Sequence, residues 1–119
     1  MLQEFQPGDL LVFQLEAGFG VIRVLGVSDE EAGRVWHLAA YRDLFMDVDS
    51  AEAAIANVGS LTTEIPHVAM TGRAFASTQV ARIGNEPLSG DEIQQVSDWN
   101  NGAERAVADR SIRLLLGYR

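Results

Sequence analysis

The sequence predicts an α+β fold: a small, strongly curved antiparallel sheet, or a partly open β-barrel, with one or two helices. Apolar side chains alternate with a period of two through the first third of the chain, which is typical of strands. Glycine-containing turns separate these runs, and two later segments begin with the residue pattern of a helix capping box. The 119 residues fit one β-rich domain, residues 1–119.

Three successive strands are expected at the start of the chain. The run Asp9–Glu16 alternates between two sets of side chains, as strands do, and Ala17–Gly18 offers a tight turn. The run Phe19–Val27 is apolar at both alternations, which is expected of a strand covered on both faces. Ser28–Gly33 is predicted to be a polar, acidic turn, and Arg34–Tyr41 resumes the strand pattern. Three strands with short connections form a meander.

The middle of the chain is predicted to hold one short helix and two further strands. Asp49 as N-cap with Glu52 three residues later has the pattern of a capping box, which places a helix at Ala51–Val58. The run Leu61–Met70 is predicted to be extended, and its proline favours an edge strand because proline cannot donate to a ladder. Gln79–Ile83 is the next strand candidate.

The last third of the chain is predicted to form a second helix and a closing strand. Ser89–Glu92 repeats the pattern of the capping box. The apolar residues after it recur at intervals of three and four, on one helix face, and Asn100–Gly102 weakens the helix. The residues of that face are Ile93, Val96, Trp99, Ala103 and Val107. Ser111–Tyr118, with its alternating apolar residues, is predicted to be a strand.

Charge sets the classes of partner that the chain is expected to bind. The formal net charge is -8, the pI is about 4.5, and every positive side chain is an arginine. This excess of negative charge disfavours binding to nucleic acids and anionic membranes and favours a partner with a basic surface. The alternative explanation is that the acidic surface only keeps the protein soluble. The sequence has no cysteine, no signal-like start and no apolar run of membrane-spanning length. We therefore expect a soluble, cytoplasmic protein of unknown oligomeric state.

Candidate partner-binding residues come from two acidic segments and an aromatic pair. The acidic segments would attract a basic surface, and reversing their charges is expected to weaken association while leaving the thermal midpoint nearly unchanged. The aromatic side chains offer apolar contact, although in small β-domains such residues more often pack in the core. The candidates are Asp29, Glu30, Glu31, Asp43, Asp47, Trp36 and Tyr41.

The sequence predicts no enzyme, no metal site and no cofactor. His37 and His67 are its only histidines, fewer than a catalytic or zinc site usually draws on, and a structural role is preferred for both. Gly18–Gly20 lacks the third glycine and the following helix of a dinucleotide-binding loop. Asp47–Asp49 lacks the glycine and the bidentate glutamate of a calcium loop.

Two segments resemble a known family. The first segment, Pro7–Leu15 followed by Gly18–Gly26, is similar to an opening strand, a glycine-x-glycine hairpin and an arginine-containing second strand. The second segment, Ile83–Ser89, is similar to an isoleucine-glycine-asparagine-x-proline-leucine turn before a capped helix. These are features of the bacterial immunity proteins of family 26 among the polymorphic-toxin immunity families. The resemblance implies a small β-rich protein that binds and blocks a cognate toxin without catalysis.

Three functions follow, in this order of preference. The first is a binding protein that neutralises a toxin or another protein. The second is a small barrel that binds a small ligand or a nucleic acid through an aromatic face. One pocket lined by Trp36, Tyr41, His37 and Arg23 would support it. The third is a small hydrolase, which requires His37 or His67 to meet a carboxylate and a nucleophile in space.

Overall fold

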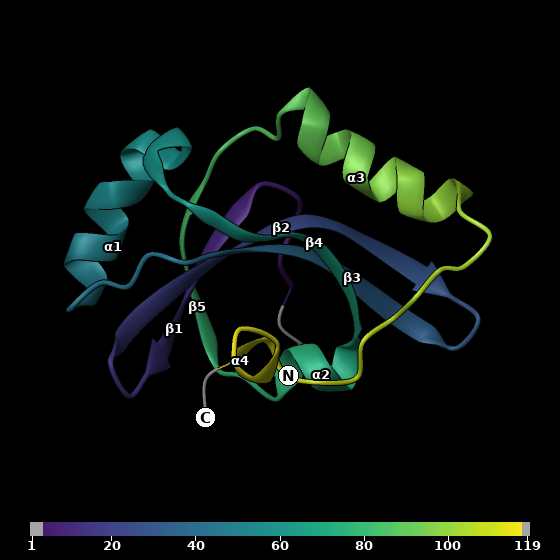
Figure 1. Cartoon of the computed structure of the whole chain (residues 1–119), viewed down its shortest axis with the longest axis horizontal. Coiled ribbons are helices and arrows are strands. Elements are labelled where there is room, and N and C mark those ends of the chain that lie inside the picture. Colours follow the sequence, from purple (N-terminus) through teal and green to yellow (C-terminus); the bar gives the residue numbers. More distant parts are fainter. Residues whose placement is uncertain (1–3, 118–119) are drawn as a thin grey trace.

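The computed structural model describes residues 4–117, which form one five-stranded antiparallel sheet with short helices around it (Figure 1). The strand order is β4-β3-β2-β1-β5, so β4 and β5 are the edges and the sheet is open. The strands are β1 (Asp9–Leu15), β2 (Gly18–Glu30), β3 (Gly33–Tyr41), β4 (Thr63–Thr71) and β5 (Val80–Asn85). This architecture confirms the predicted α+β fold class.

The predicted meander of the first three strands is confirmed, but its second turn is shorter than expected. β2 continues to Glu30, so only Glu31 and Ala32 form the turn, and the predicted polar turn at Ser28–Gly33 is wrong in length. The outer half of the β2–β3 hairpin lies beyond β1, whose ladder with β2 ends at Arg23. Polar side chains are tolerated there because part of the strand surface faces solvent.

The two later strands lie at the edges of the sheet. The predicted extended run Leu61–Met70 corresponds to β4, an edge strand that accommodates Pro66, as expected. Besides its ladder with β3, β4 forms an isolated bridge between Met70 and Ala108. The strand predicted at Gln79–Ile83 corresponds to β5, which pairs with β1. The register between β1 and β5 shifts at Leu10 and Leu11, where the ladder is irregular.

Within residues 4–117, five short helical elements connect and follow the strands. They are α1 (Val48–Ala54), the 3-10 helix η1 (Ile55–Ser60), α2 (Gly72–Ala76), α3 (Gly90–Asn101) and α4 (Ile112–Leu115). The N-cap predicted at Asp49 is wrong: the cap is Asp47, whose carboxylate accepts a hydrogen bond from the backbone N–H of Ser50 at 2.7 Å. Asp49 lies instead in the first turn, a favourable place for an acidic side chain.

The capping box before α3 is confirmed by both of its hydrogen bonds. The Ser89 N–H donates to the Glu92 carboxylate at 2.8 Å, and the Glu92 N–H donates to the Ser89 hydroxyl at 3.2 Å. The helix ends at Asn101, so Ala103 and Val107 of the predicted apolar face lie outside it. None of the helices in residues 4–117 is long and apolar enough to cross a membrane.

The strand predicted at Ser111–Tyr118 is wrong, because its described part forms α4; Tyr118 itself lies outside the described residues. The Ser111 hydroxyl caps this helix by accepting a hydrogen bond from Leu114 N–H at 3.3 Å. Ile112 is buried while Leu114 is 59% exposed, as helical spacing requires. A two-residue alternation would have buried both side chains on one face.

Apolar side chains from the central strands pack on both faces of the sheet. On one face α2 and α4 cover a core that includes Leu11, Phe13 and Ile22. On the other face α1 and η1 cover a smaller core that includes Leu10 and Val12. Neighbouring residues of β1 therefore enter different cores, as the side-chain alternation of a strand requires.

Candidate functional site

The segment between β3 and α1 displays apolar side chains on the surface. Phe45 is held by two backbone hydrogen bonds with Phe19, at 2.7 Å and 2.9 Å, and its side chain packs against the smaller core. Its neighbours Leu44 and Met46 are 39% and 84% exposed, since adjacent residues of an extended segment point in opposite directions. Val48, at the start of α1, is 37% exposed. We call residues 43–49 the Met46 strip.

Carboxylates lie beside these apolar side chains. Asp47 and Asp49 are both exposed, and the hydrogen bonds from Ser50 lower the pKa of the Asp47 carboxyl, which is therefore ionised at neutral pH. Asp43 is half-buried, and its carboxylate accepts a hydrogen bond from Thr62 N–H at 2.6 Å. Asp43 and Asp47 thus fix the backbone on either side of Met46 while contributing negative charge to the strip.

The second predicted acidic segment lies at the tip of the β2–β3 hairpin. The Asp29 carboxylate is 3.1 Å from Arg34, and the Glu30 carboxylate is 3.0 Å from Arg105, so arginines balance two of its three charges. Glu31 is exposed in the turn. This tip precedes β3 and the Met46 strip follows it, so the structure places the two acidic segments at opposite ends of one strand (Figure 1).

The aromatic candidates are buried on opposite faces of the sheet. Trp36 is 5% exposed and stacks on Phe75, with ring centroids 4.3 Å apart, in the core beneath α2. Tyr41 is 6% exposed in the other core, and burial raises the pKa of its hydroxyl. Both side chains therefore have the core role that the sequence analysis also considered. Their interpretation as partner contacts is wrong, because too little of either side chain is exposed. Strand alternation also prevents Trp36 from sharing a pocket with His37.

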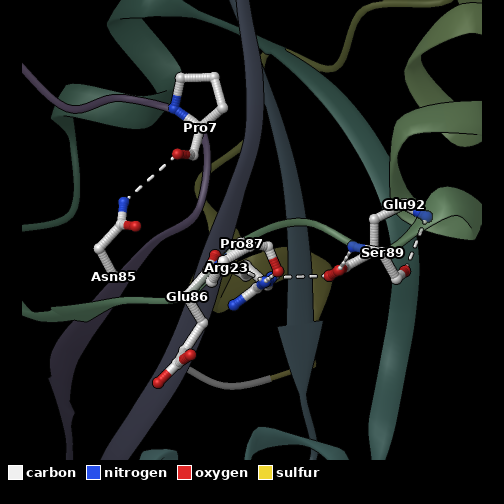
Figure 2. A network of polar contacts seen from close by, with 7 residues as sticks. All are labelled: Pro7, Arg23, Asn85, Glu86, Pro87, Ser89 and Glu92. Atoms are coloured by element: carbon white, nitrogen blue, oxygen red, sulfur yellow. Dashed lines mark hydrogen bonds and ion pairs between the residues drawn. The ribbon is translucent and has the colours of Figure 1, made fainter.

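Arg23, which the sequence suggested only as a lining residue of a small-ligand pocket, is a buried charge held in a polar network (Figure 2). The residue is 1% exposed, and its Nε lies 2.7 Å from the Glu92 carboxylate of α3. Its Nη2 donates to the backbone carbonyls of Glu86 and Pro87 at 3.0 Å and 2.9 Å. The sequence contained a signal for this role. Arg23 lies within a strand that is apolar at both alternations, so it is expected to be buried, and a buried guanidinium requires hydrogen-bond acceptors.

Asn85 makes a second connection beside Arg23. Its side-chain amide donates to the Pro7 carbonyl at 3.3 Å (Figure 2). The same amide donates to the Asp9 carboxylate at 2.9 Å. Together, Arg23 and Asn85 link the turn before α3 to β2 and to the start of β1. The segments that carry the family resemblance are therefore in contact in the folded chain.

The two histidines meet beneath α3. The His37 Nε2 lies 3.1 Å from the Ser28 hydroxyl oxygen, and the His37 Nδ1 lies 3.0 Å from the Nε2 of His67. The edge-on ring of Trp99 packs against His37, with centroids 4.8 Å apart. Burial, followed by the neighbouring His67, lowers the pKa of His37 to about 4, and burial also lowers the pKa of His67. Neutral imidazoles with a hydroxyl form a satisfied polar cluster under the helix.

The hydrolase hypothesis requires His37 or His67 to contact both a carboxylate and a nucleophile, and the cluster shows which groups His37 contacts. His37 contacts a hydroxyl, but its other ring nitrogen meets a second imidazole where that hypothesis required a carboxylate. His37 is 0% exposed. Within residues 4–117, no three histidine, aspartate or glutamate side chains are grouped so that they could hold a metal ion.

Comparisons with family models, with curated proteins and with solved structures find no match to this chain. The Met46 strip, the buried Arg23 network and the histidine cluster are thus interpreted from their own geometry.

Proposed function

We propose that the chain is an immunity-type binding protein that neutralises a cognate bacterial toxin through protein–protein contact in the cytoplasm. The observation that carries the proposal is the Met46 strip, where an 84% exposed methionine lies between carboxylates on a backbone fixed by hydrogen bonds. The similarity of Pro7–Leu15, Gly18–Gly26 and Ile83–Ser89 to immunity proteins supports the same function.

The chemistry of the strip determines the partner that it would fit. A flexible, polarisable methionine adapts to an apolar hollow on a partner and buries area when it docks. The surrounding carboxylates favour a basic rim on that partner and disfavour an acidic one. The face of a toxin that binds phosphates, as in a nuclease, has this basic character. The strip would occlude such a face without any reaction at the immunity protein.

The backbone contacts of the strip lower the cost of binding. Phe45 is anchored in the core, and Asp47 caps α1, so Met46 is displayed from a segment that is already ordered. A preformed contact surface loses less conformational entropy on association than a flexible loop does. Methionine is enriched at protein–protein interfaces, and a few residues carry most of the binding energy of an interface, so Met46 is the first residue to test.

The test is binding to the product of the neighbouring gene, which this proposal expects to be a toxin. Met46→Ser is expected to weaken the complex about tenfold or more, because it removes an apolar anchor. Ile93→Ser is the matched control, since Ile93 is 56% exposed on α3, away from the strip. Asp49→Lys tests the charge of the strip, and Glu104→Lys, at an exposed carboxylate in the segment after α3, is its control. Isothermal titration gives the dissociation constants, and survival of cells that produce the toxin gives the biological readout.

Ionic strength supplies an independent readout. Association directed by the acidic strip should slow markedly as salt rises, because screening shortens the range of electrostatic attraction. Equal loss of affinity in the strip variants and their controls, or association that is insensitive to salt, would overturn the proposal.

A further inference from the structure

A hollow of about 490 Å³ lies at the other end of β3 from the Met46 strip. Its walls are the tip of the β2–β3 hairpin, the junction of β4 with α2, and the segment that follows α3. This volume falls within the range of pockets that bind small molecules, roughly 300–1,000 Å³. The hollow belongs to a different surface from the one assigned to the toxin.

Three arginines line the hollow, although the chain as a whole is strongly acidic. Arg34, Arg73 and Arg105 line it together with one acidic residue, Glu30, which gives a formal charge of +2. The whole chain carries -8 and contains nine arginines. One third of its basic side chains therefore converge on one concavity.

An aromatic and apolar wall faces these charges. Trp99 lines the hollow beside Val35 and Val107, and the Arg105 guanidinium lies 5.2 Å from the centre of the Trp99 ring. Gly72 leaves space in the wall, because a Cβ there would meet Arg34 O only at 3.8 Å. This wall suits a ligand with a flat apolar part, since tryptophan and arginine side chains both stack on planar groups.

The arginines retain the capacity to bind an external anion. Arg105 pairs with Glu30 at 3.0 Å and Arg73 pairs with Asp109. Arg34 pairs with two carboxylates, Asp29 at 3.1 Å and Glu4 at 3.7 Å. A guanidinium has five N–H donors, and one carboxylate uses at most two of them. The side chains of Arg34 and Arg73 are 39% and 83% exposed, so an incoming anion can reach them.

We propose that this hollow binds a small organic anion, namely a planar apolar or aromatic body that carries a carboxylate or a phosphate group. The anionic group would lie against Arg73 and Arg105, and the planar body against Trp99. A small ligand needs only the unused N–H donors of the guanidinium groups, whereas an extended polyanion would also meet the acidic remainder of the surface. The proposal does not depend on the toxin-binding function.

The test is titration of the full chain with 2-naphthoate and, separately, with adenosine monophosphate, which distinguish the carboxylate from the phosphate. Neutral 2-naphthol is the control for charge. Binding is followed by calorimetry and by the NMR signal of the Trp99 indole N–H. We expect one or both anions to bind and to shift that signal, and 2-naphthol to bind at least tenfold more weakly.

Matched variants locate the site. Arg73→Gln combined with Arg105→Gln should weaken anion binding about tenfold or more, as expected for the loss of charge-assisted hydrogen bonds. Arg42→Gln is the control, because Arg42 is an exposed arginine paired with Glu64 far from the hollow. Gly72→Leu should block the hollow while keeping every charge. Absence of binding by either anion at millimolar concentration, or equal binding by the arginine variant and the control, would refute the proposal.

Discussion

The Nε of Arg23 lies 2.7 Å from the carboxylate of Glu92, and this ion pair joins the centre of the sheet to the first turn of α3. Arg23 is 1% exposed, whereas the Glu92 side chain is 25% exposed. Water can solvate part of the Glu92 carboxylate but not the Arg23 guanidinium, so Arg23 loses more when the pair is broken. Within residues 4–117 the Arg23 Nη1 has no hydrogen-bond partner. The pair therefore fixes the position of α3 at a cost in desolvation.

A double-mutant cycle measures this dependence. Glu92→Gln should lower the free energy of unfolding by about 2 kcal/mol, because it leaves a buried cation without its counter-charge. In an Arg23→Met background the same change should cost only about 0.5 kcal/mol, since the cation is gone. Urea denaturation of the four proteins gives both values. Equal costs in the two backgrounds would mean that the ion pair contributes no coupling.

The histidine cluster predicts that stability falls on mild acidification. The pKa of His37 is about 4 in the folded chain, against 6.5 for an ordinary histidine, so between these values the unfolded chain binds more protons. The contribution of His37 is complete above pH 6.5 and is lost as the pH falls towards 4. A shift of this size corresponds to at most about 3 kcal/mol.

Denaturation curves measured between pH 7.5 and pH 4 with buffers of equal ionic strength test this dependence. His37→Gln should flatten the slope and leave a smaller one from His67, whose pKa is also lowered by burial. Glu30 acts in the opposite sense, since its charge raises the pKa of His37. Glu30→Gln should therefore steepen the slope. An unchanged slope in His37→Gln would show that the loss of stability arises elsewhere.

The cap of α1 distinguishes two neighbouring aspartates. Asp47→Ala should lower the thermal midpoint by a few degrees, because the Ser50 N–H loses its acceptor. Asp49→Ala should change it much less, since Asp49 contributes only through its charge in the first turn. The pKa of Asp47 is lowered by the cap, so its contribution exists above the ordinary pKa of 3.8 and disappears below the lowered one.

Scanning calorimetry of the two variants tests this difference. From the sequence, charge reversal in the acidic segments was expected to leave the thermal midpoint nearly unchanged. Asp43 and Asp47, however, each accept a hydrogen bond from a backbone N–H, so their substitution removes a hydrogen bond as well as a charge. A fall in the thermal midpoint is therefore expected from those two substitutions. A larger effect at Asp49 than at Asp47 would contradict the observed cap.

Local sequence determined the elements whose causes lie within a few residues. The alternation of Asp9–Leu15 and the two-sided apolar run of β2 produce strands without any distant contact, and Ser89 with Glu92 forms a capping box that four residues specify. The same local logic placed the first cap at Asp49, because Asp47 was equally able to serve. Choosing between two adequate caps requires knowing where the chain leaves the sheet.

Only the tertiary structure decided which side chains meet. Ser28, His37 and His67 come from three different strands, and their contact depends on the register of β2 with β3 and of β3 with β4. Arg23 is stable in the interior because Glu92 arrives from a distant helix and the turn before that helix supplies two backbone carbonyls. Local propensity cannot encode such contacts, since their free energy exists only when both elements have docked. The fold class was therefore predictable from the sequence, whereas the polar clusters and the exposed strip were not.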